Sequence, residues 1–391
     1  MRFVVSLALA GACILSVCFT AQPARADAAA MPAISGMALI EGRSFLVVMD
    51  TKADKDTDRV GVITVGEGGG YDYTPVTVLW PVAPSNDLES ACPLPGKPGE
   101  FLVCESGSWT DRATGEFHQG RIFHLSVSQA SGVWSVQVLG TLLVPLELHE
   151  VEGIVAMIGS ANPPTKPTSN AGYDSEYRES TRSAQQYGDG VGTAQPTAQS
   201  APTPPTSVPP TPPGAPPGSC MPPGCNPRLL TPPSPSLLLV LGVRGGGSPY
   251  EPAVLHWGYA DLDAGTLDVR DQGGLPLDRY AGGYPYVRGC SDLYLDPAGV
   301  LWVATSEDTG DAGPFRSSVW RFGPFMPDRL SVFDHYFYTD QLSRNNVAWV
   351  MDGIKIEALA APLLDGSVLS YATDDESYGG VWRPLGPAEA Q

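Results

Sequence analysis

The sequence is poor in positive charge. It contains 23 Lys and Arg residues against 42 Asp and Glu residues, which gives a formal net charge of −19 at pH 7. The basic residues do not gather into a stripe anywhere along the chain. Such a chain repels nucleic acid and anionic membranes and favours cations or neutral molecules as partners. We therefore expect no nucleic-acid ligand.

The sequence also lacks the motifs of common catalytic machineries. It has no Gly-x-Ser-x-Gly elbow, no His-Glu-x-x-His and no Gly-x-x-x-x-Gly-Lys loop for phosphate. Cys-x-x-Cys is missing and the five His are scattered, so a zinc site is not indicated.

Long apolar runs are missing except at the start of the chain. Arg2 precedes an apolar run from Phe3 to Phe19, and Ala24-Arg25-Ala26 is typical of a signal cleavage site. We expect residues 1–26 to be a signal peptide, because the run is short for a membrane span; an uncleaved anchor is the alternative. The mature protein is then periplasmic or secreted, with no membrane insertion after signal cleavage.

Cysteine is sparse, and two of the seven cysteines lie in the signal peptide. Cys220 and Cys225 are candidates for a small disulfide loop in an oxidising compartment. Cys92 and Cys104 lie on strands expected to be neighbours, so a second bridge is possible. Alternatively Cys92, Cys104 and Cys290 are buried reduced thiols.

Helical periodicity is almost absent, whereas Gly-Gly, Asp-Gly and Pro-Gly turns recur between β-branched and aromatic runs. A repeated unit is present, in which a short apolar run, a loop and a second β-prone run follow one another. The units begin near Ser35, Leu88, Val151, Ser291 and Ile356. The 53 positions from Gly36 to Glu89 and the 63 from Glu89 to Glu152 suit a four-stranded blade. The sequence predicts an all-β fold, a β-propeller of about five to six blades; a pair of sandwiches is the alternative.

One stretch interrupts the repeat. Residues 160–236 are rich in Pro, Ser, Thr, Gln and Ala, a composition that cannot bury a core and favours disordered chain. We expect this stretch to be a disordered insertion within the third unit. The propeller then consists of residues 27–159 and 237–391, and we expect Ala33-Ile34-Ser35 to close the ring against the last strands, where the two ends could assemble a sixth unit.

The repeat predicts a functional face. The first strand of each blade lines the channel, so residues at one repeat position converge. Acidic residues recur at that position and at the ends of the second strands, which reach the same face. Oxygen ligands of this kind suit calcium better than zinc or copper. We predict Ca²⁺ at the channel mouth, with these candidate ligands: Glu89, Glu152, Asp292, Glu357, Glu105 and Asp374. The alternative is that these carboxylates only accept hydrogen bonds from backbone amides of neighbouring blades.

Other polar residues are expected at the same mouth. His149 and Glu152 are candidate catalytic residues, because either could take a proton from water; a purely structural His149 is the alternative. Arg244 and Arg288 are candidates for binding an anionic substrate group, or for pairing with the surrounding carboxylates.

Several segments resemble a known group of proteins. Asp87-Leu88-Glu89-Ser90-Ala91, Val151-Glu152-Gly153-Ile154 and Leu241-Gly242-Val243-Arg244-Gly245 are similar to segments of an uncharacterised bacterial propeller family, as is Asp374-Asp375-Glu376-Ser377-Tyr378-Gly379-Gly380. That family is akin to the phytase-like esterase family and, more distantly, to regucalcin-type lactonases. The lactonase resemblance implies a divalent metal on the Glu at the start of a first strand, which Glu89 or Glu152 matches. Phytase-like relatives bind substrate phosphate with basic residues, whereas this mouth is mainly acidic.

Taken together, these features predict an exported, monomeric propeller with a calcium-binding mouth. As an enzyme it would be a metal-assisted hydrolase of esters, lactones or phosphate esters acting on a small-molecule substrate. The alternative is a non-catalytic propeller that binds a ligand, a protein or another partner in the cell envelope.

Overall fold

The computed structural model describes residues 31–53, 58–81, 83–111, 113–159, 237–245, 253–275, 287–307, 309–310, 312–323, 347–364, 366–375 and 379–387. The expected signal peptide (1–26), the expected insertion (160–236) and the candidate disulfide of Cys220 and Cys225 lie outside these residues. No helix in the described ranges is long and apolar enough to cross a membrane.

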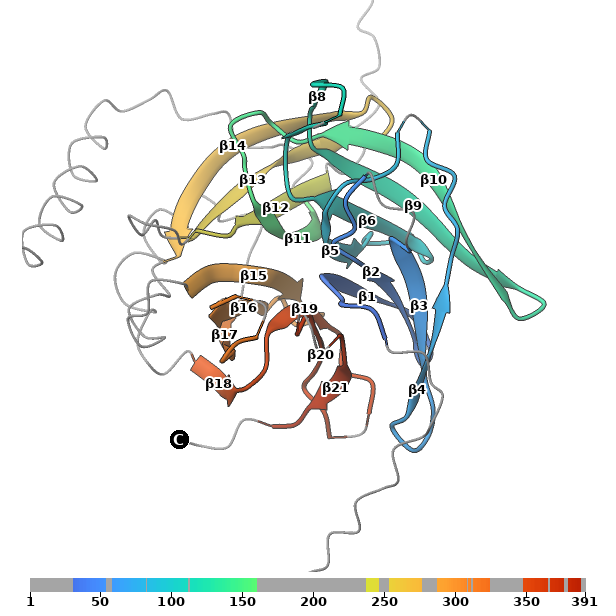
Figure 1. Cartoon of the computed structure of the whole chain (residues 1–391), viewed down its shortest axis with the longest axis vertical. Helices are drawn as coiled ribbons and strands as arrows, with labels where there is room; N and C mark the ends of the chain where they lie inside the picture. The colour runs from blue at the N-terminus through green and yellow to red at the C-terminus, as the bar shows by residue number, and fades with distance from the viewer. Residues whose placement is uncertain are drawn as a thin grey trace, which may run out of the picture.

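The fold is a β-propeller, as the repeat predicted, and it has five blades (Figure 1). The first blade contains β1 (Gly36–Glu41), β2 (Ser44–Val48), β3 (Val60–Val65) and β4 (Tyr71–Pro75). The second contains β5 (Leu88–Pro93), β6 (Glu100–Glu105), β9 (Arg121–Ala130) and β10 (Val133–Leu143), and carries a small hairpin of β7 (Trp109–Thr110) and β8 (Phe117–His118). The third contains β11 (Val151–Ile158), β12 (Leu237–Val243), β13 (Ala253–Asp261) and β14 (Thr266–Leu275).

The last two blades complete the ring. The fourth contains β15 (Val287–Leu295), β16 (Leu301–Glu307), β17 (Arg316–Phe322) and β18 (Val347–Asp352). Three strands of the fifth are described, namely β19 (Ile356–Ala360), β20 (Leu369–Thr373) and β21 (Trp382–Leu385). Neighbouring strands within every blade are antiparallel.

The innermost strands β1, β5, β11, β15 and β19 surround the propeller axis (Figure 1). The chain closes the ring where residues just before β1 meet the fifth blade. Ile34 N donates to Thr373 O at 3.1 Å, and Gly380 N donates to Met31 O at 3.1 Å. The two ends of the described chain therefore join the first and fifth blades directly, and the described residues form no sixth blade.

The core lies between the blades, because each blade buries both faces against its neighbours. Phe101 and Phe123 of the second blade pack with Leu46 of the first, and Trp320 of the fourth packs with Leu255 of the third. Full burial of one such side chain stabilises the fold by about 1.5–3 kcal/mol. Five clusters of this kind, one at each blade interface, hold the inner strands in place.

The described cysteines are core residues. Cys92, Cys104 and Cys290 are buried and free, so the predicted alternative of reduced thiols is correct and a bridge between Cys92 and Cys104 is not formed. Burial raises the pKa of all three thiols, which keeps them in the neutral form.

Candidate functional site

Three glutamates lie at β-bulges, each near the start of a different innermost strand. Leu88 pairs with Glu105 and Ser90 with Cys104, so that Glu89 has no partner residue on β6. The same shift in register leaves Glu152 on β11 without a partner residue on β12, and Glu357 on β19 without one on β20. A bulge turns the extra side chain away from the regular alternation of the strand. All three glutamates are buried. Glu152 and Glu357 share Arg288 as an ion-pair partner, and the charges of both raise the pKa of Glu89.

A corner of the chain precedes each of these bulges. Asp87 and Glu150 have positive φ angles of 62° and 53°, which are uncommon for residues other than glycine. The carbonyl oxygens of Asp87, Glu150 and Lys355 each accept a hydrogen bond from the residue that follows the second strand, at 2.9, 2.9 and 3.2 Å. Each corner thus presents a charged side chain two residues before a bulged glutamate.

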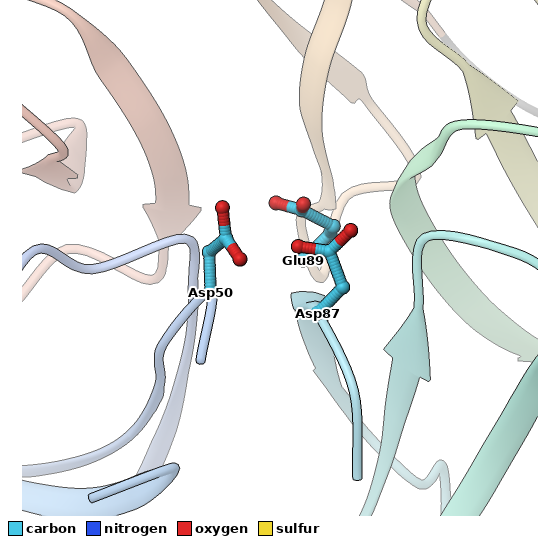
Figure 2. A group of neighbouring side chains, drawn as sticks. All are labelled: Asp50, Asp87 and Glu89. Atoms are coloured by element: carbon cyan, nitrogen blue, oxygen red, sulfur yellow. The ribbon is translucent and has the colours of Figure 1, made fainter. Parts of the chain in front are cut away.

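The first and second blades bring three carboxylates together. One carboxylate oxygen from each of Asp50, Asp87 and Glu89 lies within 4.8 Å of the others. Asp50 reaches the group from one side, and Asp87 and Glu89 from the other (Figure 2). Gly36 allows this approach of the two blades, because a Cβ at Gly36 would lie 2.6 Å from Ser90 Cα. We call Asp50, Asp87 and Glu89 the carboxylate cluster.

Lys52 neutralises part of the carboxylate cluster. Its Nζ lies 2.8 Å from Asp50 Oδ1 and also contacts Asp87 Oδ1. Ser106 Oγ donates a 2.8 Å hydrogen bond to Asp87 Oδ2. Burial and the neighbouring Asp87 raise the pKa of Asp50 to about 7. Burial opposes ionisation of Asp87 as well, but hydrogen bonds from Asp50 and Lys52 lower its pKa to about 2.

Glu89 differs from Asp50 and Asp87 because no cation in the described part of the chain pairs with it. Its side chain is only 7% exposed. No hydrogen bond or ion pair to Glu89 is found among the residues that the structure describes. Burial raises the pKa of Glu89 well above its usual range, and the charges of Glu152 and Asp87 raise it further. The cluster therefore contains a buried carboxyl group that no other described residue pairs with.

The opposite side of the mouth is an ion-pair network. Arg244 Nη1 lies 3.4 Å from Glu152 Oε1, and Arg288 Nη1 lies 3.7 Å from Glu152 Oε2 and 2.8 Å from Glu357 Oε1. Lys355 Nζ lies 3.1 Å from Glu357 Oε1. Burial raises the pKa of both glutamates, to about 8 for Glu357, although the nearby cations act against this. Glu152 and Glu357 are thus paired with cations, in contrast to Glu89.

The remaining predicted ligands lie outside the carboxylate cluster. Asp374 is 3.6 Å from Lys355 Nζ and extends the ion-pair network. Glu105 accepts hydrogen bonds from Asn86 N at 2.7 Å and from Arg121 N at 2.9 Å, and its carboxylate forms a 2.6 Å ion pair with Arg121. Both Glu105 oxygens are therefore engaged within the second blade.

Asp292 also has both oxygens engaged. Ser90 Oγ donates to Oδ1 at 2.7 Å, and Leu359 N donates to Oδ2 at 2.6 Å. The register of β15 against β16 shifts between Arg288 and Asp292, so Asp292 comes after the bulge and not within it. The structure therefore places it deeper in the channel than the three bulged glutamates.

His149 is exposed on the loop before β11. Within the described residues, no hydrogen bond or ion pair joins it to a mouth carboxylate. Sequence reasoning missed three charged residues of the mouth, namely Asp87, Lys52 and Lys355. The recurrence of a charged residue two positions before the bulge, in Asp87-Leu88-Glu89, Glu150-Val151-Glu152 and Lys355-Ile356-Glu357, is the signal that could have identified Asp87.

Comparison with known proteins gives no family for the chain. No protein-family model and no curated protein matches the sequence. Among solved structures, an exo-1,5-alpha-L-arabinanase from a bovine ruminal metagenomic library is similar at 11% identity and a TM-score of 0.38, over 90% of this chain and 93% of that one. A thermostable family-43 glycoside hydrolase is similar at 7% identity and a TM-score of 0.41, over 92% and 95%. An exo-beta-1,3-galactanase from Clostridium thermocellum is similar at 10% identity and a TM-score of 0.37, over 89% of this chain and 58% of that one.

Proposed function

We propose that the channel mouth binds a calcium ion at Asp50, Asp87 and Glu89 and that the protein hydrolyses an ester, a lactone or a phosphate ester there. The observation that carries the proposal is Glu89, whose buried carboxyl group faces Asp50 and Asp87 without a partner among the described residues (Figure 2). An uncompensated carboxyl group in such a place is costly unless a cation or a proton joins it.

The donor set of the carboxylate cluster fits calcium. All three side chains offer oxygen, which hard cations such as calcium prefer, and the cluster contains no His or Cys ligand of the kind that zinc or copper prefers. Calcium takes six to eight oxygens, so backbone oxygens, water or substrate would complete its shell. Its two charges would offset the three carboxylates more fully than the single charge of Lys52 can.

In this proposal the other residues of the channel mouth act on the substrate or on the attacking water. A bound divalent cation supplies Lewis-acid polarisation of a substrate oxygen. Glu152 is the proposed general base, because its buried Oε2 lies 3.7 Å from Arg288 Nη1 but accepts no hydrogen bond within the described part of the chain. Arg244, whose side chain is 30% exposed, is proposed to hold an anionic group of the substrate, together with the less exposed Arg288. His149 at the rim is the second candidate for the proton acceptor.

The test has two readouts. Calorimetry on chelator-treated protein is expected to show heat on addition of calcium, and the heat is expected to be lost in Glu89→Gln. Glu67→Gln, in the exposed turn between β3 and β4, is the matched control and should bind calcium as the wild type does. Absence of heat in the wild type would refute the cation site.

Activity is tested with aryl esters, lactones and phosphate monoesters, each with calcium and with a chelator. Calcium-dependent turnover that Glu152→Gln abolishes, without loss of the calcium heat, would support the assigned roles. Calcium binding without turnover of any of these substrates would instead favour the non-catalytic alternative, in which the same face holds a ligand or a protein. Turnover that is insensitive to chelation would contradict the part given to the cation.

A further inference from the structure

Lys52 places a positively charged group within the carboxylate cluster. It lies two residues after Asp50 in the chain, and its ammonium group contacts Asp50 and Asp87, while Glu89 has no ion pair with any residue that the structure describes. The Lys52 side chain is 51% exposed, so it has open space into which it can move. The cluster therefore contains a tethered monovalent cation that meets two of its three carboxylates.

A free cation has to compete with this ammonium group. A divalent ion at the three carboxylates would lie close to Nζ, and the two positive charges would repel one another strongly in this partly buried place. Binding of the ion therefore requires Lys52 to leave. Because the ammonium group is attached to the site, its effective concentration there is of the order of millimolar or higher.

We infer that Lys52 determines the specificity of the site, by excluding monovalent cations while allowing a divalent cation to bind. This inference rests on the proposed cation site. Sodium or potassium carries the same charge as the ammonium group and gains little by replacing it. A divalent cation carries twice the charge, so its attraction to all three carboxylates, including Glu89, exceeds that of the ammonium group and it can displace Lys52.

The experiment compares calcium binding to the wild type and to Lys52→Gln by calorimetry. Each protein is titrated at about 0.15 M ionic strength, once in potassium chloride and once in tetramethylammonium chloride, whose cation is too large for the site. The wild type is expected to bind calcium equally well in both salts. Lys52→Gln is expected to bind calcium about fivefold more tightly in tetramethylammonium, because the partly exposed ion pairs of Lys52 with Asp50 and Asp87 no longer have to be broken, and to lose several-fold of that affinity in potassium.

Two control variants accompany the comparison. Lys97→Gln removes a lysine of similar exposure, 53%, that pairs with Glu100 at 3.5 Å on another part of the second blade, and it should behave as the wild type. Lys52→Arg keeps the tethered charge and should keep the indifference to potassium. A general electrostatic effect of the lost charge would tighten calcium binding in both salts alike, so the potassium dependence is specific to competition at the site.

The outcomes separate the two proposals. If Lys52→Gln binds calcium but is as indifferent to potassium as the wild type, the part given to Lys52 is wrong and the cation site stands. If neither protein releases heat with calcium, the cation site itself is refuted, and the inference with it. Calcium binding that appears only in Lys52→Gln would also overturn the inference, because Lys52 would then exclude divalent cations as well as monovalent ones.

Discussion

Ser90 and Asp292 are 202 positions apart in the sequence, yet Ser90 Oγ donates a 2.7 Å hydrogen bond to Asp292 Oδ1 across the propeller axis. Ser90 Oγ in turn accepts from Ile154 N at 3.0 Å, and Asp292 Oδ2 accepts from Leu359 N at 2.6 Å. Two side chains thereby join the inner strands of four blades, β5, β11, β15 and β19. Ser90 follows Glu89 directly in β5, so these hydrogen bonds fix the backbone next to a member of the carboxylate cluster.

Substitution of Asp292 tests the importance of this link for stability. Asp292→Ala would leave the Ser90 hydroxyl and the Leu359 amide buried without their acceptor, each at a cost of about 1–3 kcal/mol. We expect the free energy of unfolding, measured with urea, to fall by about 2–4 kcal/mol. Asp263→Ala, at an exposed loop position, is the control and should change it by less than about 0.5 kcal/mol. Equal stability of the two variants would show that the axial link contributes little.

The blades could be predicted from the sequence because each repeats a local pattern. Leu88-Glu89 and Ile356-Glu357 each begin a short buried strand, and their period is set by the length of a four-stranded sheet. The contact of Ile34 with the last blade was also expected, because a closed ring of blades requires the first and last blades to meet. The number of blades followed only from the structure, because residues before β1 complete the last interface and do not form a unit of their own.

The site was less accessible to such reasoning. Asp292 aligns with Glu89 by spacing alone, but the irregular register of β15 moves it past the bulge and into the axial link. Asp87 belongs to the cluster because of a corner with positive φ, which lies outside the strand pattern. Lys52 meets Asp87 only because two blades stand side by side. The irregular register of β15 and the contact between Lys52 and Asp87 leave no periodic trace in the sequence, whereas the charged residue two positions before each bulged glutamate does recur.

The stability of the cation-free protein should depend on pH through Asp50. Its pKa rises from 3.8 to about 7 on folding, so its contribution to stability is fully present below pH 3.8 and is lost as the pH rises through 7. We expect thermal unfolding in the presence of a chelator to shift to lower temperature over this range. Asp50→Asn should weaken that dependence, whereas Asp72→Asn, on the edge strand β4, should leave it unchanged. An unaltered profile in Asp50→Asn would contradict the assignment.

The two arginines of the mouth should differ in their effect on folding. Arg288→Met removes a cation shared by the buried Glu152 and Glu357, and we expect a loss of up to about 3 kcal/mol in the free energy of unfolding. Arg244→Gln removes a more exposed partner and should cost less than about 1 kcal/mol. Adding Glu152→Gln to Arg288→Met should restore part of the loss, as a double-mutant cycle would measure. Additive losses would show that the pair does not interact.

The long segment within the third blade should be removable. Ile158 at the end of β11 pairs directly with Leu237 at the start of β12, so a two-residue turn can join them. The bulged Glu152 stands at the opposite end of β11, which places this junction on the face away from the mouth. Replacing residues 159–236 by Asn-Gly should therefore give a folded protein with an unchanged calcium titration, and a longer Gly-Ser linker controls for strain in the turn. A folded variant that had lost the calcium heat would show that the segment contributes to the mouth, because the blade itself would be intact.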